Sequence, residues 1–250
     1  RGRLVPFYNS NYDGMVTPSD SSAEYLLDNG IRIPVFVVPL GIDPNLWRPT
    51  PRPQQGPFVF LAYGTPVDRK QPANVIAAFA EAFPPDQYPD VRLVVKGRGT
   101  ALTEAIKQCP ELKDDRITII DATWGQRRLL HLIQNAHCLL FVTESEGFGL
   151  PPLEALAMGV PTIMSDHTAM RPFAHLGYPI RAIDTRTIRL WDGTLTTQNI
   201  PDWALAIQVM RAVYKDYPQA CRKAAWASGI VRKEYTWQRT VERLWGVLTA

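Results

Sequence analysis

A chain of 250 residues with 46% apolar and 20% charged side chains is long enough for one large α/β domain and resembles ordinary globular proteins in composition. Its net charge is only +3, and its basic residues are interleaved with acidic ones, which argues against nucleic-acid binding. Three widely spaced cysteines favour reduced thiols and a cytoplasmic location, and the sequence shows neither a signal peptide nor an apolar run of about 18 residues that would predict a membrane helix.

The first part of the chain predicts one helix, one strand and a linker. Ser19 or Asp20 is a helix cap, and Gly30 stands where that helix ends. Residues 34–39 alternate well enough for a strand. Four prolines between 48 and 57 then predict a stiff, extended segment.

From residue 57 onward, predicted strands alternate with predicted helices. Apolar runs predict strands at 58–63, 91–96, 116–120, 138–142, 160–164 and, as an edge strand, 179–183. Amphipathic stripes predict helices at 71–83, 101–109 and 125–135. The fold class is therefore α/β, a Rossmann-like, doubly wound parallel sheet with helices on both faces.

The last quarter of the chain predicts a polar loop at 184–200 and three helices at 201–216, 218–231 and 236–249. The final helix has an apolar stripe that includes Trp237 and Trp245. Core tryptophans are the simpler interpretation of this stripe, and a docking face is the alternative.

The most informative stretch is 137–164, which predicts a strand, a glycine turn, a helix and a second strand. The turn contains Gly147 and Gly149, and a glycine turn at a helix start presents free backbone amides that suit a phosphate. Glu146 and Glu154 bracket this turn, eight positions apart. Carboxylates beside an anion site are explained if they accept hydrogen bonds from hydroxyls. A sugar nucleotide supplies both parts, and we expect the two glutamates to face one cavity.

The turn after the first strand of the sheet contains Asp68, Arg69 and Lys70. Two cations on a turn that opens a helix are suited to clamping a diphosphate. A solvated basic turn is the alternative.

The segment Ser145-Glu-Gly-Phe-Gly-Leu-Pro-Pro-Leu-Glu-Ala-Leu-Ala-Met-Gly-Val-Pro resembles the signature of retaining GT-B glycosyltransferases of the family 4 type. The resemblance covers about residues 15–249. It implies the donor-binding C-terminal half of a GT-B hexosyltransferase, without most of the N-terminal acceptor domain and inactive in its absence. The implied domains are a remnant of the first domain and hinge at 1–50, a Rossmann-like nucleotide-sugar-binding domain at 51–235 and a C-terminal helix at 236–250.

The same resemblance implies roles for individual residues. Glu146 holds the transferred sugar, with Arg69 and Lys70 as the catalytic phosphate pair, and Glu154 holds the ribose of a UDP- or GDP-linked donor. The chain departs from the family at Thr65, where many members have arginine, so Arg69 is the candidate for that role. Further donor contacts are expected at Gly64, Gly97, Arg98, Gly147, Phe148, Gly149 and Leu150.

The resemblance also implies transfer without a bound metal or cofactor beyond the donor. The four histidines have no zinc spacing, and Asp114 and Asp115 are interpreted as a surface pair. A dinucleotide site at Gly97 is disfavoured because Leu102 stands where a third glycine is needed. The alternative function is a non-catalytic sugar-nucleotide-binding or scaffold module, and an acceptor at a membrane surface is a further partner that the family allows.

Overall fold

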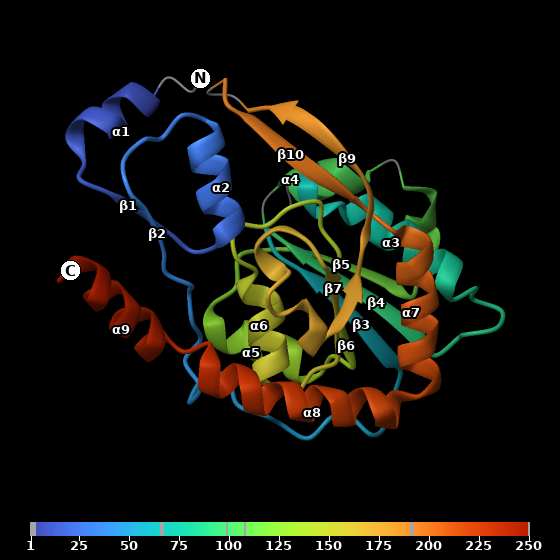
Figure 1. The fold of residues 1–250 in the computed structure, drawn as a ribbon. Helices are drawn as coiled ribbons and strands as arrows, with labels where there is room; N and C mark the ends of the chain where they lie inside the picture. Colours follow the sequence, from blue (N-terminus) through green and yellow to red (C-terminus); the bar gives the residue numbers. More distant parts are fainter. Residues whose placement is uncertain (1–3, 66–67, 99, 108, 191–192, 250) are drawn as a thin grey trace.

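The computed structural model describes residues 4–65, 68–98, 100–107, 109–190 and 193–249. Its centre is a six-stranded parallel sheet with the strand order β5-β4-β3-β6-β7-β8 (Figure 1). The strands are β3 (Phe58–Tyr63), β4 (Val91–Gly97), β5 (Ile117–Asp121), β6 (Cys138–Phe141), β7 (Thr162–Ser165) and β8 (Tyr178–Ile180). This order runs outward in both directions from β3 and β6, as in a doubly wound sheet, so the predicted fold class is confirmed.

Helices cover both faces of this sheet (Figure 1). They are α3 (Pro72–Ala82), α4 (Thr100–Ile106), α5 (Gln126–Gln134), α6 (Leu150–Ala157), α7 (Trp203–Lys215) and α8 (Tyr217–Glu234). Short 3-10 turns lie at η1 (Asp68–Lys70), η2 (Pro110–Lys113), η3 (Thr168–Met170) and η4 (Ala174–Leu176).

Strand β3 shows why the sheet is buried on both sides. Phe60 belongs to the core that α3 and α7 cover, where it packs against Phe79 and Phe83. The next residue, Leu61, belongs to the core on the opposite face, beneath α6 and α8. Successive side chains of a strand point to opposite faces, so a strand that is apolar at every position needs a cover on each.

The start of the chain forms a small unit beside the main sheet. It contains α1 (Val5–Asn11), β1 (Met15–Thr17), α2 (Asp20–Asp28) and β2 (Val35–Val37), and β1 pairs with β2 in parallel. The Ser19 side chain accepts a hydrogen bond from the Ser22 backbone amide, so the predicted helix cap is confirmed.

A backbone clasp joins this early segment to the end of the chain. The amide of Ile42 donates to the carbonyl of Tyr235 at 2.9 Å, and the amide of Trp237 donates to the carbonyl of Ile42 at 3.2 Å. A Cβ on Gly41 would lie 2.1 Å from the Thr236 carbonyl carbon, so this approach requires glycine. The clasp holds the turn between α8 and α9 (Trp237–Leu248) against residues 41–42.

The predicted loop at 184–200 is wrong. Strands β9 (Ala182–Arg189) and β10 (Leu195–Pro201) form an antiparallel hairpin, in which Thr187 pairs with Thr197 and Arg189 with Leu195. Both faces of the hairpin are largely polar. The alternation of apolar and polar residues that signals a half-buried strand is therefore missing from its sequence.

The core interpretation of the α9 tryptophans is also wrong. Trp237 is 45% exposed and Trp245 is 67% exposed, with Val241 and Leu248 exposed between and beyond them. Figure 1 shows α9 projecting from the body of the molecule beside the small N-terminal unit. No helix in the described part of the chain is long and apolar enough to cross a membrane.

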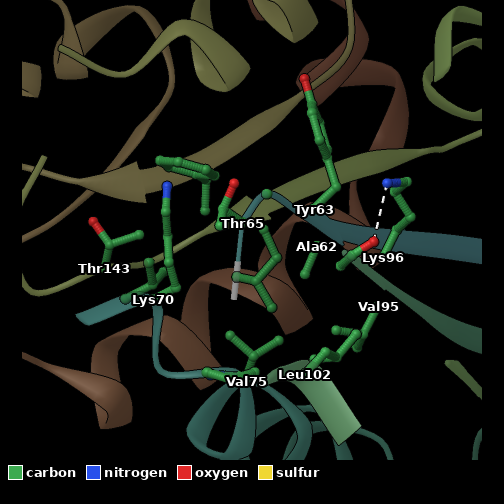
Figure 2. Close-up of a pocket in the computed structure, with 15 residues that line it drawn as sticks. Ala62, Tyr63, Thr65, Lys70, Val75, Val95, Lys96, Leu102 and Thr143 are labelled. Atoms are coloured by element: carbon green, nitrogen blue, oxygen red, sulfur yellow. Dashed lines mark hydrogen bonds between the residues drawn. The ribbon is translucent and has the colours of Figure 1, made fainter. Parts of the chain in front are cut away.

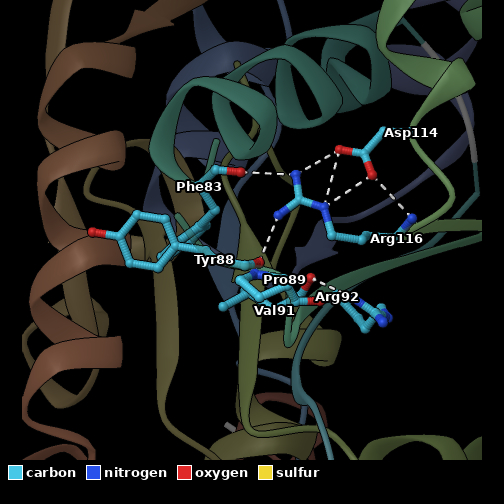
Figure 3. A network of polar contacts seen from close by, with 7 residues as sticks. All are labelled: Phe83, Tyr88, Pro89, Val91, Arg92, Asp114 and Arg116. Atoms are coloured by element: carbon cyan, nitrogen blue, oxygen red, sulfur yellow. Dashed lines mark hydrogen bonds and ion pairs between the residues drawn. The ribbon is translucent and has the colours of Figure 1, made fainter. Parts of the chain in front are cut away.

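A buried arginine ties the edge of the sheet to the loop after α3 (Figure 3). The Arg116 side chain, 3% exposed, donates to the backbone carbonyls of Phe83 and Tyr88, each at 2.8 Å. It also pairs with Asp114, and this hydrogen bonding lowers the pKa of the Asp114 carboxyl. Asp114 is therefore part of a largely buried network, and its assignment to a surface pair is corrected.

Candidate functional site

The strand order identifies where a ligand can bind. Strands β3 and β6 are neighbours, and the chain winds away from them in opposite directions, so their carboxyl ends border a crevice. The loop after β3 contains Arg69 and Lys70, and the loop after β6 contains Glu146. Two stretches almost 80 positions apart thus meet at this crevice.

Glu146 is the centre of the cluster. Its Oε1 lies 2.7 Å from Arg69 Nη1 and 2.6 Å from Lys70 Nζ, and its side chain is only 7% exposed. The Glu146 amide donates to Thr168 Oγ1 at 3.1 Å, and Arg69 Nη1 also donates to the Ser145 carbonyl at 2.5 Å. One carboxylate therefore orders two cations, and together these three charged side chains leave the cluster with a net charge of +1.

Lys70 is held in a partly apolar setting. Its Nζ lies 4.2 Å from the centre of the Phe141 ring. Burial lowers the pKa of Lys70, and the neighbouring Glu146 carboxylate opposes that shift. The ammonium group is thus desolvated beforehand, which strengthens its attraction for an anion.

The glycine turn is shaped for the helix that follows it. Gly149 has φ 103° and stands at the N-cap of α6, and a Cβ there would lie 2.8 Å from Met170 Cγ. Phe148 is buried against Phe173, with their ring centres 6.0 Å apart. The Gly147 carbonyl accepts a hydrogen bond from Ser19 Oγ at 2.9 Å, so the cap of α2 contacts this turn.

Glu154 lies one turn into α6 and pairs with a residue that the sequence analysis did not identify. The Tyr63 hydroxyl donates to Glu154 Oε2 at 2.9 Å. Burial raises the pKa of Glu154, and the hydrogen bond from Tyr63 acts in the opposite direction. Burial, followed by the Glu154 charge, raises the pKa of Tyr63 well above its ordinary value. The tyrosine therefore keeps its proton and donates a hydrogen bond to Glu154.

Two cavities flank the cluster. The smaller, of about 40 Å³, is lined by Gly64, Lys70 and Gly97 among others, and beside it Lys96 Nζ donates to the Gly97 carbonyl at 3.0 Å (Figure 2). The larger, of about 850 Å³, is lined by Arg69, Glu146 and Gly147 together with α2 and the β9–β10 hairpin. The first volume is on the scale of single waters, whereas the second falls within the roughly 300–1,000 Å³ of ligand pockets.

The predicted site residues are only partly brought together. Among the described residues that line these two cavities, Glu146 is present but Glu154 is not, so the expectation that both face one cavity is not met. Arg98 is exposed and lines neither cavity, and Phe148 lines a third one, of about 360 Å³.

Thr168 was missed as well, although a signal for it exists. It follows β7, the strand next to β6, and the carboxyl ends of neighbouring parallel strands meet at one edge of the sheet. Its φ is 52°, an unusual conformation for threonine, and it places Oγ1 against the Glu146 amide.

Comparisons with known proteins agree with this geometry. The sequence profile described as "Glycosyl transferases group 1" matches residues 44–178. The chain is 26% identical to D-inositol 3-phosphate glycosyltransferase of Mycolicibacterium smegmatis, over 93% of this chain and 51% of that protein. The chain thus spans about half the length of this curated relative.

Solved structures show the same fold at low identity. Anabaena HepE, solved in complex with UDP and glucose, has a TM-score of 0.76 at 14% identity, covering 98% of this chain and 65% of that one. Sucrose-phosphate synthase from Thermosynechococcus elongatus has a TM-score of 0.73 at 16% identity, covering 96% of this chain and 59% of that one. The crevice between β3 and β6 therefore lies in a GT-B type of sheet.

Proposed function

The chain belongs to the glycosyl transferases of group 1, and on that premise we propose that it is the donor-binding half of a retaining, family 4 type hexosyltransferase. Its donor is a UDP- or GDP-linked sugar, held without a metal or cofactor. The observation that carries this proposal is the cluster in which Glu146 pairs with both Arg69 and Lys70 at the crevice.

The two cationic side chains, Arg69 and Lys70, bind the diphosphate of the donor in this proposal. Arg69 and Lys70 approach Glu146 from the loop after β3, and the backbone amides at the start of α6 lie beyond Gly149. Negative charge grows on the diphosphate as its bond to the sugar breaks. Cationic side chains and backbone amides that already point toward that charge stabilise the transition state more than the ground state.

Glu146 positions the sugar and does not attack it in this proposal. Its Oε1 already faces two cations at 2.6–2.7 Å, and a carboxylate oxygen engaged by two charged hydrogen-bond donors is a weaker nucleophile. A carboxylate that is ordered in this way can still accept hydrogen bonds from sugar hydroxyls. Glu146 lines the large cavity together with Arg69 and Gly147.

The second candidate function is a sugar-nucleotide-binding module without transfer. It would bind the donor with the same cluster of Glu146, Arg69 and Lys70. In the catalytic proposal the acceptor half supplies the opposite wall of the cleft. The exposed stripe of α9, with Trp237 and Trp245, is then the surface available to that half.

Nucleotide binding tests the proposal directly. We expect UDP or GDP to raise the melting temperature of this chain, whereas ADP does not, and UDP is the first probe because Anabaena HepE was solved with it. A nucleotide at 100 times its dissociation constant stabilises the folded state by about 2.7 kcal/mol. Differential scanning fluorimetry measures the shift. A chain that responds to no nucleotide would contradict the proposed function, and one that binds without supporting transfer in the full-length protein would favour the module.

Replacing Glu154 tests the ribose site. We expect Glu154→Ala to weaken binding of the preferred nucleotide by about 10- to 100-fold, because a charged acceptor contributes roughly 1.5–3 kcal/mol per hydrogen bond. Isothermal titration calorimetry measures the dissociation constant. Tyr63→Phe is the matched control, since it removes the 2.9 Å bond to Glu154 but keeps the carboxylate. Equal affinities for Glu154→Ala and the unmodified protein would refute this assignment.

A further inference from the structure

The large cavity has a wall that the donor does not require. One side is the loop with Glu146 and Gly147, the second is α2, and the third is the β9–β10 hairpin. Figure 1 shows α2 and the hairpin next to each other above the carboxyl edge of the sheet. A donor sugar held at Glu146 would contact the loop side of this cavity of about 850 Å³, and α2 and the hairpin supply the rest of the lining discussed below.

We propose that α2 and one face of the hairpin form a subsite for a carbohydrate acceptor. The proposal rests on the donor role of Glu146 and specifies what the cavity holds beside it.

The hairpin presents a regular polar surface to this cavity. Thr187 and Thr197 are cross-strand partners that both line it, and Asn199, two residues further along β10, lines it too. Residues two apart on a strand share a face, so these groups form one patch. Hydroxyl and amide groups both donate and accept hydrogen bonds, which suits the hydroxyls of a saccharide.

Helix α2 completes the subsite from the other side. Glu24 and Asp28, one helical turn apart, line the cavity together with the hydroxyl-bearing residues Ser21 and Tyr25. Carboxylates are acceptors only, and a sugar hydroxyl is a donor that matches them. Leu190 and Leu195 are the aliphatic residues among the described lining.

The hairpin is anchored at its base. The Glu144 carboxylate, whose side chain is 4% exposed, receives Arg186 Nη2 on both oxygens at 2.8 Å. The Asn199 amide donates to the Glu144 carbonyl at 2.9 Å, and the Glu144 amide donates to the Arg69 carbonyl at 2.8 Å. Glu144 thus joins the hairpin to the loop after β3, which contains Arg69 and Lys70.

The far end of the hairpin is anchored to α2. Asn29 donates to the Leu195 carbonyl at 3.0 Å and accepts from the Leu195 amide at 3.1 Å. The Tyr25 hydroxyl lies 2.7 Å from Thr194 Oγ1. A wall fixed at both ends is pre-organised, and pre-organisation lowers the entropy lost when a ligand binds.

The test compares the double variant Thr187→Val/Thr197→Val with Thr118→Val. The control makes the same change at an exposed threonine of β5, which is not among the described cavity lining. The full-length protein, saturated with UDP or GDP, is applied to an array of neutral mono- and oligosaccharides. Calorimetry on the same samples measures nucleotide affinity.

We expect the unmodified protein and Thr118→Val to bind the same saccharides. The double variant will bind them at least about tenfold more weakly, with nucleotide affinity unchanged within twofold. In the transfer assay its KM for the acceptor rises, while its KM for the donor does not.

Undiminished saccharide binding by the double variant would overturn the inference, as would failure of the unmodified, nucleotide-bound protein to bind any saccharide. Both outcomes leave the proposed function standing. Failure to bind any nucleotide would overturn the proposed function and this inference with it.

Discussion

Replacing Glu146 with glutamine will lower the rate of sugar transfer by about 10²- to 10³-fold, the loss typical of removing one pre-organised polar group from an active site. The amide keeps the shape of the side chain but cannot balance Arg69 and Lys70, which lie 2.7 and 2.6 Å from it. Initial rates in the full-length protein, with the donor that the nucleotide panel identifies, measure the effect.

The same variant has a second, pH-dependent consequence. The Glu146 charge raises the pKa of Lys70 against the lowering by burial, so its loss lowers that pKa further. Lys70 must be protonated to attract a diphosphate, and protonation is lost as the pH rises through its pKa. As the pH is raised, nucleoside diphosphate binding will therefore weaken at a lower pH in the variant than in the unmodified protein.

The control for Glu146→Gln is Glu104→Gln, the same change at an exposed glutamate paired with Lys107. We expect it to leave transfer and the pH profile unaltered. A Glu146→Gln protein that kept more than a tenth of the rate would exclude Glu146 from the reaction centre.

Replacing Arg116 with alanine will destabilise the protein by about 3–5 kcal/mol, the usual cost of removing one partner from a buried ion pair. The change leaves the carbonyls of Phe83 and Tyr88 and the carboxylate of Asp114 without this donor. In a domain of this size the melting temperature should fall by roughly 6–20 °C. Thermal unfolding followed by circular dichroism measures it.

At acidic pH, the difference in free energy of unfolding between Arg116→Ala and the unmodified protein should become smaller. The pKa of Asp114 is lowered in the folded state, mainly by its hydrogen bond from Arg116. The pair therefore stabilises the fold at pH values above the pKa of Asp114 in the unfolded chain. This stabilisation is lost as the pH falls through the lower pKa of Asp114 in the folded protein. Lys107→Ala is the control, because its pair with Glu104 is exposed and should contribute less than about 1 kcal/mol. An Arg116→Ala protein that melts within 2 °C of the unmodified protein would contradict this prediction, because the carbonyls of Phe83 and Tyr88 would then have found other hydrogen-bond donors.

The sheet could be predicted from the sequence because its strands are buried on both faces. The run Phe58–Tyr63 is apolar throughout, and its bounds agree with those of β3. The hairpin could not be predicted in this way. Its ladder joins polar residues such as Thr187 and Thr197, and its anchor at Glu144 lies 42 positions before Arg186.

The site divides in a similar manner. Glu146 and Lys70 follow strands that a doubly wound order places side by side, so their proximity follows from topology. The pairing of Tyr63 with Glu154 depends instead on how α6 is rotated over β3. Sequence patterns indicate which face of a helix is buried, but they do not fix which polar group meets which across the interface.

The clasp between Ile42 and the turn at 235–237 has a mechanical consequence. Backbone hydrogen bonds couple two stretches almost 200 positions apart, so they are displaced together when either moves. The Thr240 hydroxyl of α9 also donates to the Pro39 carbonyl at 2.8 Å, so a displacement of residues 39–42 would carry the start of α9 with it.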